Sequence, residues 1–140
     1  MSQNTLDKPC CVCLTLCSEI IEDVRTRSKS VISIFNSVGA SQVPTIYPRL
    51  CVLASVTNAD PDTPVRIAIT LPSGGELFSA DGKTLPGDKS SVTDFPLEVQ
   101  GVLLPEVGVY TVTLQVAGDL IAQRLFQVFI APQQPPAATA

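Results

Sequence analysis

The most regular hydrophobic pattern in this chain is a strict alternation of apolar and polar positions over residues 110–116. One face carries Tyr110, Val112, Leu114 and Val116, and the other carries Thr111, Thr113 and Gln115. A period of two predicts a strand with one buried and one solvated face, as in an antiparallel sheet. Residues 65–71 alternate in the same way, so we expect a chain built from half-buried strands.

Shorter apolar runs between turn-forming residues predict the remaining strands. We expect one strand in each of residues 31–35, 50–56, 76–80, 95–103 and 120–130. Residues 36–49 contain Gly39, Pro44 and Pro48, and are expected to form a long connection. Residues 18–26 fit either a short helix or an extension of the preceding strand, and we favour the extension.

The amino-terminal segment 10–17 is apolar at both odd and even positions. Such a strand is covered on both faces, on one by the opposing sheet and on the other by a crossing segment or a second subunit. We expect residues 31–35 to pair back on it as a hairpin.

A chain of 140 residues is long enough to form one hydrophobic core without disulfides or metals. Aromatic residues make up only 5% of it, so Val, Ile and Leu must fill the core, and β-branched residues favour strands. We therefore expect a single β-sandwich domain at 9–131. A flexible polar segment at 1–8 precedes it, and a disordered tail rich in Pro and Ala follows at 132–140.

The residues that lead into the alternating segment are Glu106, Val107, Gly108, Val109 and Tyr110. Their spacing, acidic-x-Gly-x-Tyr, resembles the start of strand F in immunoglobulin-like and fibronectin-III-like domains, where the Tyr hydroxyl bonds back to the backbone. The resemblance covers about residues 50–130. It implies an all-β, antiparallel β-sandwich of about seven to nine strands, with an amino-terminal hairpin and at most one short helix.

In this resemblance Gly108 and Tyr110 have structural roles. Val112 stands where antibody-type domains have a cysteine, and the chain has no Trp, so an antibody-type domain is excluded. The layout also resembles an uncharacterised bacterial family of unknown function. Neither resemblance implies any catalytic residue.

The chain contains no histidine, which removes the commonest general acid–base catalyst and imidazole metal ligation. No glycine-rich phosphate loop opens a helix either. We expect a protein that is not an enzyme and uses no cofactor. Catalysis by carboxylates alone stays open, because a sequence cannot show a cleft.

The charge distribution bears on the partners. The chain has 9 basic and 13 acidic residues, and its only basic cluster, residues 25–29, is flanked by acidic ones. Phosphate binding needs several Lys or Arg on one surface, and a membrane helix needs about 20 apolar residues in succession. We find neither these features nor a secretory signal, so we expect no nucleic-acid or membrane partner and a cytoplasmic location.

Four of the five cysteines lie within residues 10–17, and this odd, uneven set does not suggest a secreted disulfide framework. A period of two places Cys11, Cys13 and Cys17 on one side of a strand, where Cys51 could complete a thiolate metal site. However, residues 11 and 17 of an extended strand lie about 20 Å apart. We therefore expect no metal, and interpret these thiols as small buried apolar groups.

The leading hypothesis is a non-enzymatic protein–protein interaction or assembly module that associates with its own copies. Contiguous apolar patches on a surface usually mark interfaces. The candidates come from the two strands that are apolar on both faces: Val12, Leu14, Leu16, Ile121, Leu125 and Phe129. The alternative is a thiolate metal-binding or redox protein that uses the amino-terminal cysteines.

Overall fold

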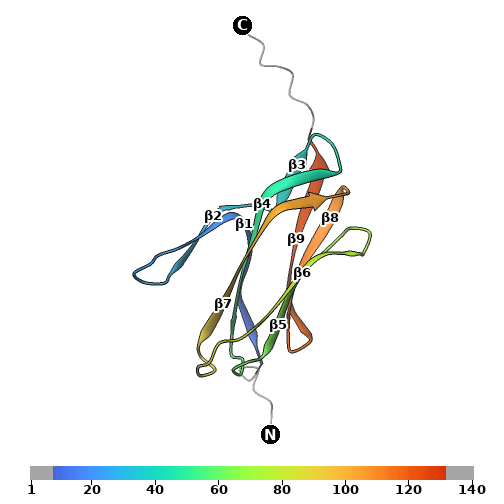
Figure 1. Ribbon diagram of the computed structural model, residues 1–140. Helices are drawn as coiled ribbons and strands as arrows, with labels where there is room; N and C mark the ends of the chain where they lie inside the picture. Colours follow the sequence, from blue (N-terminus) through green and yellow to red (C-terminus); the bar gives the residue numbers. More distant parts are fainter. Residues whose placement is uncertain (1–7, 132–140) are drawn as a thin grey trace.

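The computed structural model describes residues 8–131, and these form nine strands and no helix. The strands are β1 (Cys10–Glu22), β2 (Lys29–Ile34), β3 (Ser37–Ala40), β4 (Thr45–Thr57), β5 (Pro64–Thr70), β6 (Glu76–Lys83), β7 (Val92–Leu104), β8 (Gly108–Val116) and β9 (Asp119–Ile130). They form two sheets, ordered β2-β1-β4-β7 and β3-β9-β8-β5-β6 (Figure 1). The all-β sandwich is confirmed, whereas the predictions for 1–7 and 132–140 lie outside the described residues.

The core lies between the two sheets and is filled by the alternating faces that the sequence predicts. Along β8, every second side chain from Tyr110 to Val116 is buried. They face an equivalent set from β4, which includes Leu50, Val52 and Val56. Aliphatic side chains therefore supply most of the buried surface.

The strand order is that of an immunoglobulin-like sandwich. In this fold strands A, B and E adjoin in one sheet, and strands C, F and G adjoin in the other. Here β1, β4 and β7 occupy the first set of positions, and β5, β8 and β9 occupy the second. One pair departs from the predicted antiparallel arrangement, because β3 pairs in parallel with β9.

A tyrosine corner fixes the start of β8, as the resemblance implies. The Tyr110 hydroxyl donates a hydrogen bond to the Glu106 carbonyl oxygen at 2.7 Å. The Glu106 carboxylate in turn accepts a hydrogen bond from the Ser73 amide at 2.8 Å. Gly108 has a φ of +128°, and a Cβ there would lie 2.9 Å from Pro72 Cβ. Contacts at Glu106, Gly108 and Tyr110 thus explain why each of these three residues stands at its position in the motif.

One segment differs from the sequence-based expectation, and in a second the favoured extension of the first strand is confirmed as far as Glu22. Residues 36–49 are not one connection, because they contain β3 and the beginning of β4. The short-helix alternative for residues 18–26 is wrong, since β1 continues to Glu22 and a turn follows, in which the Asp23 carboxylate accepts a hydrogen bond from the Arg25 amide at 2.8 Å. In both segments, pairing with a neighbouring strand satisfies backbone groups whose partners a local pattern cannot reveal.

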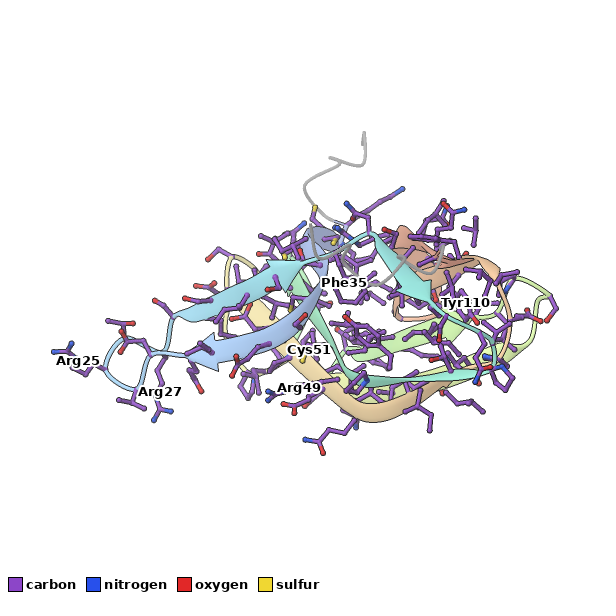
Figure 2. The ribbon with its side chains drawn as sticks, turned by 90° about the horizontal axis from the view of Figure 1, so that it is seen from above. Arg25, Arg27, Phe35, Arg49, Cys51 and Tyr110 are labelled. Carbon is purple, nitrogen blue, oxygen red and sulfur yellow. The ribbon has the colours of Figure 1, made fainter. Side chains whose placement is uncertain are left out.

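Beyond Cys17, β1 leaves β4 and pairs only with β2. We call this hairpin, residues 18–34, the β1–β2 arm. It projects from the sandwich with Arg25 and Arg27 near its tip (Figures 1 and 2). Next to the turn of the arm, where Lys29 pairs with Glu22, Lys29 Nζ lies 3.6 Å from a carboxylate oxygen of Asp94 in β7. The arm thus contributes to the cover of the outer face of the first sheet.

Candidate functional site

Of the three interface candidates in β1, only Val12 faces outward. Cys11 pairs with Val56 and Cys13 pairs with the adjacent Ser55, so Val12 is the extra residue of a β-bulge. Its side chain is 57% exposed, whereas Leu16 is fully buried. Leu14 also packs against the core cluster. Leu14 and Leu16 are therefore core residues and not surface contacts.

A second bulge separates the three candidates in β9. Leu114 pairs with Ala122 and Gln115 pairs with Leu120, so Ile121 is the extra residue. The Ile121 side chain packs against the core cluster. Leu125 and Phe129 point outward and are 53% and 39% exposed. Ile121 therefore does not share the exposed face of Leu125 and Phe129, and it is wrong as an interface candidate.

The two exposed candidates belong to a contiguous apolar patch. Val109 of β8 lies opposite Gln127 of β9, so its diagonal neighbours on the same face are Leu125 and Phe129. Val109 is itself 48% exposed. We call these three side chains the β8–β9 patch. The alternation in the sequence places Val109 outward, but only the register shows that it lies between the other two.

Gly39 of β3 gives the patch its shape at the edge of the sheet. Gly39 is the register partner of Phe129, and a Cβ on Gly39 would lie 3.2 Å from Cζ of the phenyl ring. The ring therefore lies close above the β3 backbone. A glycine at this position leaves space for it.

The β1–β2 arm carries a second group of exposed aliphatic side chains, which sequence reasoning missed: Ile21, Val24, Ile32 and Ile34. Residues 32 and 34 alternate with 31, 33 and 35, so a period-two reading assigns them to one face. Their exposure follows from the projection of the arm, which the sequence pattern does not indicate.

The structure does not gather the cysteines as the strand period suggests. Because of the bulge, Cys11 packs on the core, whereas Cys13 lies on the outer face, where its Sγ is 3.1 Å from Thr15 Oγ1. Cys17 and Cys51 are register partners on that outer face, and both are fully buried. Among residues 8–131, no group of three or more Cys, Asp or Glu side chains is placed to hold a metal ion.

The surroundings of the buried thiols make them poor nucleophiles. Burial is the main cause that raises the pKa of the Cys17 thiol, and its neighbour Cys51 raises it further. Burial and the Glu98 carboxylate raise the pKa of the Cys51 thiol, against the opposing effect of Arg49. The thiolate is the reactive form, and the raised pKa of each group favours the less reactive thiol at neutral pH.

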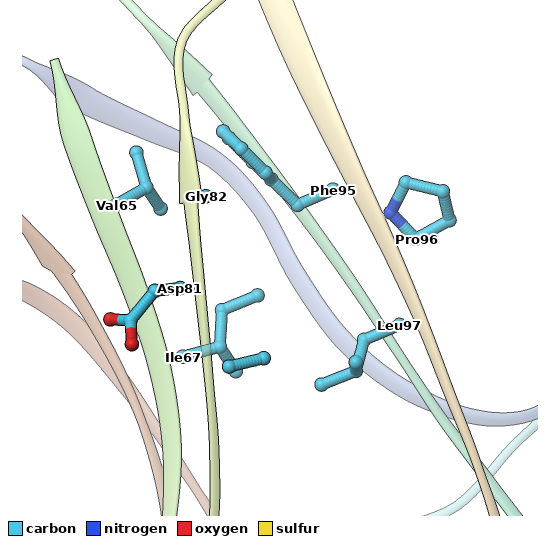
Figure 3. Close-up of a pocket in the computed structure, with 8 residues that line it drawn as sticks. Val65, Ile67, Asp81, Gly82, Phe95, Pro96 and Leu97 are labelled. Carbon is cyan, nitrogen blue, oxygen red and sulfur yellow. The ribbon is translucent and has the colours of Figure 1, made fainter. Parts of the chain in front are cut away.

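The two lateral sides of the sandwich differ. On one side, Arg124 of β9 spans the gap between the sheets and donates a hydrogen bond to the Leu14 carbonyl of β1 at 3.2 Å. Its other terminal nitrogen donates to the Asn36 side chain at 2.6 Å. On the opposite side, β6 and β7 leave an apolar cleft that contains a cavity of about 140 Å³ (Figure 3).

Residues 12–129 match the sequence family described as a family of unknown function, DUF6941. The chain belongs to this family. The match begins at the bulge residue of β1 and ends at Phe129, so the DUF6941 segment includes the sandwich, the arm and the β8–β9 patch.

No curated protein matches this DUF6941 chain. Among solved structures, an immunoglobulin-like protein from Pseudomonas aeruginosa is 13% identical with a TM-score of 0.49, over 90% of this chain and all of that one. The alkylpurine DNA glycosylase AlkC from Pseudomonas fluorescens, bound to DNA containing an abasic site analogue, is 11% identical with a TM-score of 0.49. That alignment covers 86% of this chain and spans 30% of the glycosylase chain.

No helix within residues 8–131 has the length and apolar character needed to cross a membrane.

Proposed function

We propose that this protein is a non-enzymatic protein–protein interaction module that associates with its own copies through the β8–β9 patch. The supporting observation is the contiguity of Val109, Leu125 and Phe129 on the outer face of one sheet. These side chains lose contact with water only if another surface covers them, and apolar burial is the main driving force of association.

The position of the patch favours a symmetric contact. It lies on adjacent strands of a sheet face, and a face of this kind can meet the same face of a second copy about a two-fold axis. Leu125 and Phe129 extend furthest toward the β3 edge, where Gly39 adds no side chain. A sheet-on-sheet contact between two copies would therefore bury all three residues on each side.

The β1–β2 arm supports the same function independently. An isolated two-stranded hairpin is at best marginally stable in water, and this one presents Ile32 and Ile34 to solvent. A neighbouring subunit that packs against the arm would bury these side chains. The thiolate alternative has less support, because Cys11 and Cys13 lie on opposite faces of β1.

The test introduces a negative charge into the apolar patch and compares it with a matched control variant. Leu125→Asp places a carboxylate within the patch, whereas Gln123→Asp places one two residues away on the same outer face of β9. Light scattering coupled to size-exclusion chromatography, over a series of protein concentrations, measures the mass of each variant. We expect oligomers of the wild type and of Gln123→Asp, and monomers of Leu125→Asp with an unchanged circular dichroism spectrum.

Two results would contradict the proposal. A wild-type protein that stays monomeric over the whole concentration series does not self-associate. If Leu125→Asp keeps the wild-type mass, the protein associates through another surface, and Ile34→Asp then tests the arm.

A further inference from the structure

The cleft between β6 and β7 lies on the side of the sandwich opposite Arg124, and just beyond the end of β6 the Leu85 amide donates a hydrogen bond across it to Thr93 Oγ1 at 3.3 Å. Its cavity of about 140 Å³ is lined mainly by apolar groups, which come from Val65 and Ile67 of β5, Ala80 and Gly82 of β6, and Phe95 and Leu97 of β7 (Figure 3). β6 and β7 are the last strands of their respective sheets. Within residues 8–131, each rim of the cleft is therefore a strand edge without a pairing neighbour.

The cavity exists because β6 places small residues at two successive inward positions. Ala80 is the register partner of Ile67, and Gly82 is the partner of Val65, so both face the core side of the sheet. A Cβ on Gly82 would lie 3.3 Å from the Phe95 ring. The phenyl group covers Gly82, and the space beside Ala80 remains open.

The hydrogen bonds around β5 show which backbone groups of β6 are free. Thr84 N donates to Thr63 O at 3.0 Å, so residue 84 points toward β5. Backbone groups alternate in direction along an antiparallel strand, so those of Ala80 and Gly82 also point toward β5. The amides and carbonyls of Ser79, Asp81 and Lys83 therefore point away from the sheet, along its open edge.

The two rims are not equivalent as templates for a further strand. β7 contains Pro96, which lines the cleft and has no N–H to donate. A proline in an edge strand is a common protection against pairing with another chain. β6 contains no proline from Glu76 to Lys83, so its outward amides are all available.

We propose that the β6 edge binds an extended segment of a different polypeptide as an added strand, with one apolar side chain of that segment inserted beside Ala80. The free amides and carbonyls of β6 require a partner with a regular row of donors and acceptors, which an extended peptide backbone supplies. The residue that pairs with Ala80 points into the cleft, since paired residues share a face. A cavity of about 150 Å³ holds a benzene-sized group, so this one has room for one aliphatic or small aromatic side chain.

This site is distinct from the β8–β9 patch. The patch lies on the outer face of β8 and β9, whereas the cleft opens beside β6, which lies beyond β5 in the same sheet. The added strand would extend the sheet order to β3-β9-β8-β5-β6-peptide. Self-association through the patch and peptide binding at the cleft can therefore succeed or fail independently.

The experiment is an NMR titration of the full-length protein with a blocked peptide of sequence Lys-Thr-Val-Thr-Val-Thr-Lys. The control peptide replaces both valines with threonine, which keeps the shape and backbone but exchanges one methyl group of each side chain for a hydroxyl. We expect saturable amide shifts at Ser79, Asp81 and Lys83 with the valine peptide. The control peptide should bind about tenfold more weakly, since each apolar methyl contributes to burial.

Variants at Ser79 and Ala80 test the two elements of the site separately, namely the backbone edge of β6 and the apolar cavity. Ser79→Pro removes one outward N–H and leaves the cavity intact, and should weaken binding about three- to tenfold, the value of one net hydrogen bond. Ser79→Ala keeps the N–H and should bind like the wild type. Ala80→Leu fills the cavity and should abolish the preference for valine over threonine.

The proposal is overturned if the valine peptide gives no saturable shifts in a protein that is folded by its own spectrum. It is also overturned if the shifts fall on β2 or β3 instead of β6. Shifts at β6 that appear on raising the protein concentration without peptide would show that the occupant is a second copy of this chain, which also contradicts binding of a different polypeptide.

Discussion

The tyrosine corner offers the most direct test of how the fold is stabilised. Tyr110→Phe removes only the hydroxyl that donates to the Glu106 carbonyl oxygen at 2.7 Å. The ring stays buried and stacked on Phe126, with their centroids 5.1 Å apart. We expect a loss of about 0.5–1.5 kcal/mol for the hydrogen bond itself, and up to about 3 kcal/mol because the Glu106 carbonyl is left without its partner.

Tyr47 is the matched control, since it is the only other tyrosine in the chain. Its ring packs on Phe35 with centroids 5.4 Å apart, and its hydroxyl makes no hydrogen bond within residues 8–131. Tyr47→Phe should therefore change the free energy of unfolding by no more than about 0.5 kcal/mol. Urea denaturation followed by circular dichroism measures both variants, and the slope of the unfolding free energy against urea should stay constant.

The pH dependence of this difference provides a second measurement. Burial raises the pKa of Tyr110 above the ordinary value of 10.0. The folded protein therefore holds the phenolic proton more tightly than the unfolded chain does, and its stability falls as the pH rises above about 10 toward the raised pKa. The advantage of the wild type over Tyr110→Phe should be constant below that pH and shrink above it. Equal stabilities of Tyr110→Phe and Tyr47→Phe at neutral pH would refute the structural role of the corner.

Three further predictions test other parts of the structure. Leu16→Ala should cost about 2–5 kcal/mol of unfolding free energy because the side chain is fully buried, whereas Val12→Ala should cost about 0.5 kcal/mol or less; similar costs would contradict the bulge. Gly108→Ala should destabilise the protein by about 1–3 kcal/mol, since it combines a left-handed φ with a clash against Pro72, and Gly118→Ala, at φ +84° with open space around it, should cost less by the same urea assay. Iodoacetamide followed by mass spectrometry should modify the exposed Cys10 in the native protein and reach Cys17 and Cys51 only after unfolding; rapid alkylation of either buried thiol would show that the base of the arm opens.

The local pattern of apolar and polar residues was sufficient to predict a strand wherever that strand has one buried and one solvated face. β5 and β8 alternate cleanly, and the structure confirms both within two residues of the predicted bounds. The corner at Glu106, Gly108 and Tyr110 was also readable, because its contacts lie within a few residues of one another or follow from one left-handed glycine. β3 was missed, since its pairing with β9 depends on residues about ninety positions away.

Two single-residue bulges account for the errors among the candidate surface residues. A bulge at Val12 turns Leu14 and Leu16 into the core, and another at Ile121 separates that residue from Leu125 and Phe129. A strand with apolar residues on both faces gives no signal for the position of a bulge, because either register buries hydrophobic groups. The pairing with the partner strand determines where the bulge lies and therefore which apolar residues face the core.

The sequence by itself determined the class of this protein: aliphatic, β-branched strands of period two, joined by turns and closed by a tyrosine corner, in a chain without histidine. These properties are local, since they depend on the backbone geometry and chemistry of neighbouring residues. The tertiary structure alone decided which apolar side chains stay at the surface, that the arm projects, and that β6 borders an open cleft. Those properties depend on register and on the relative positions of the two sheets, which arise from contacts between residues far apart in the chain.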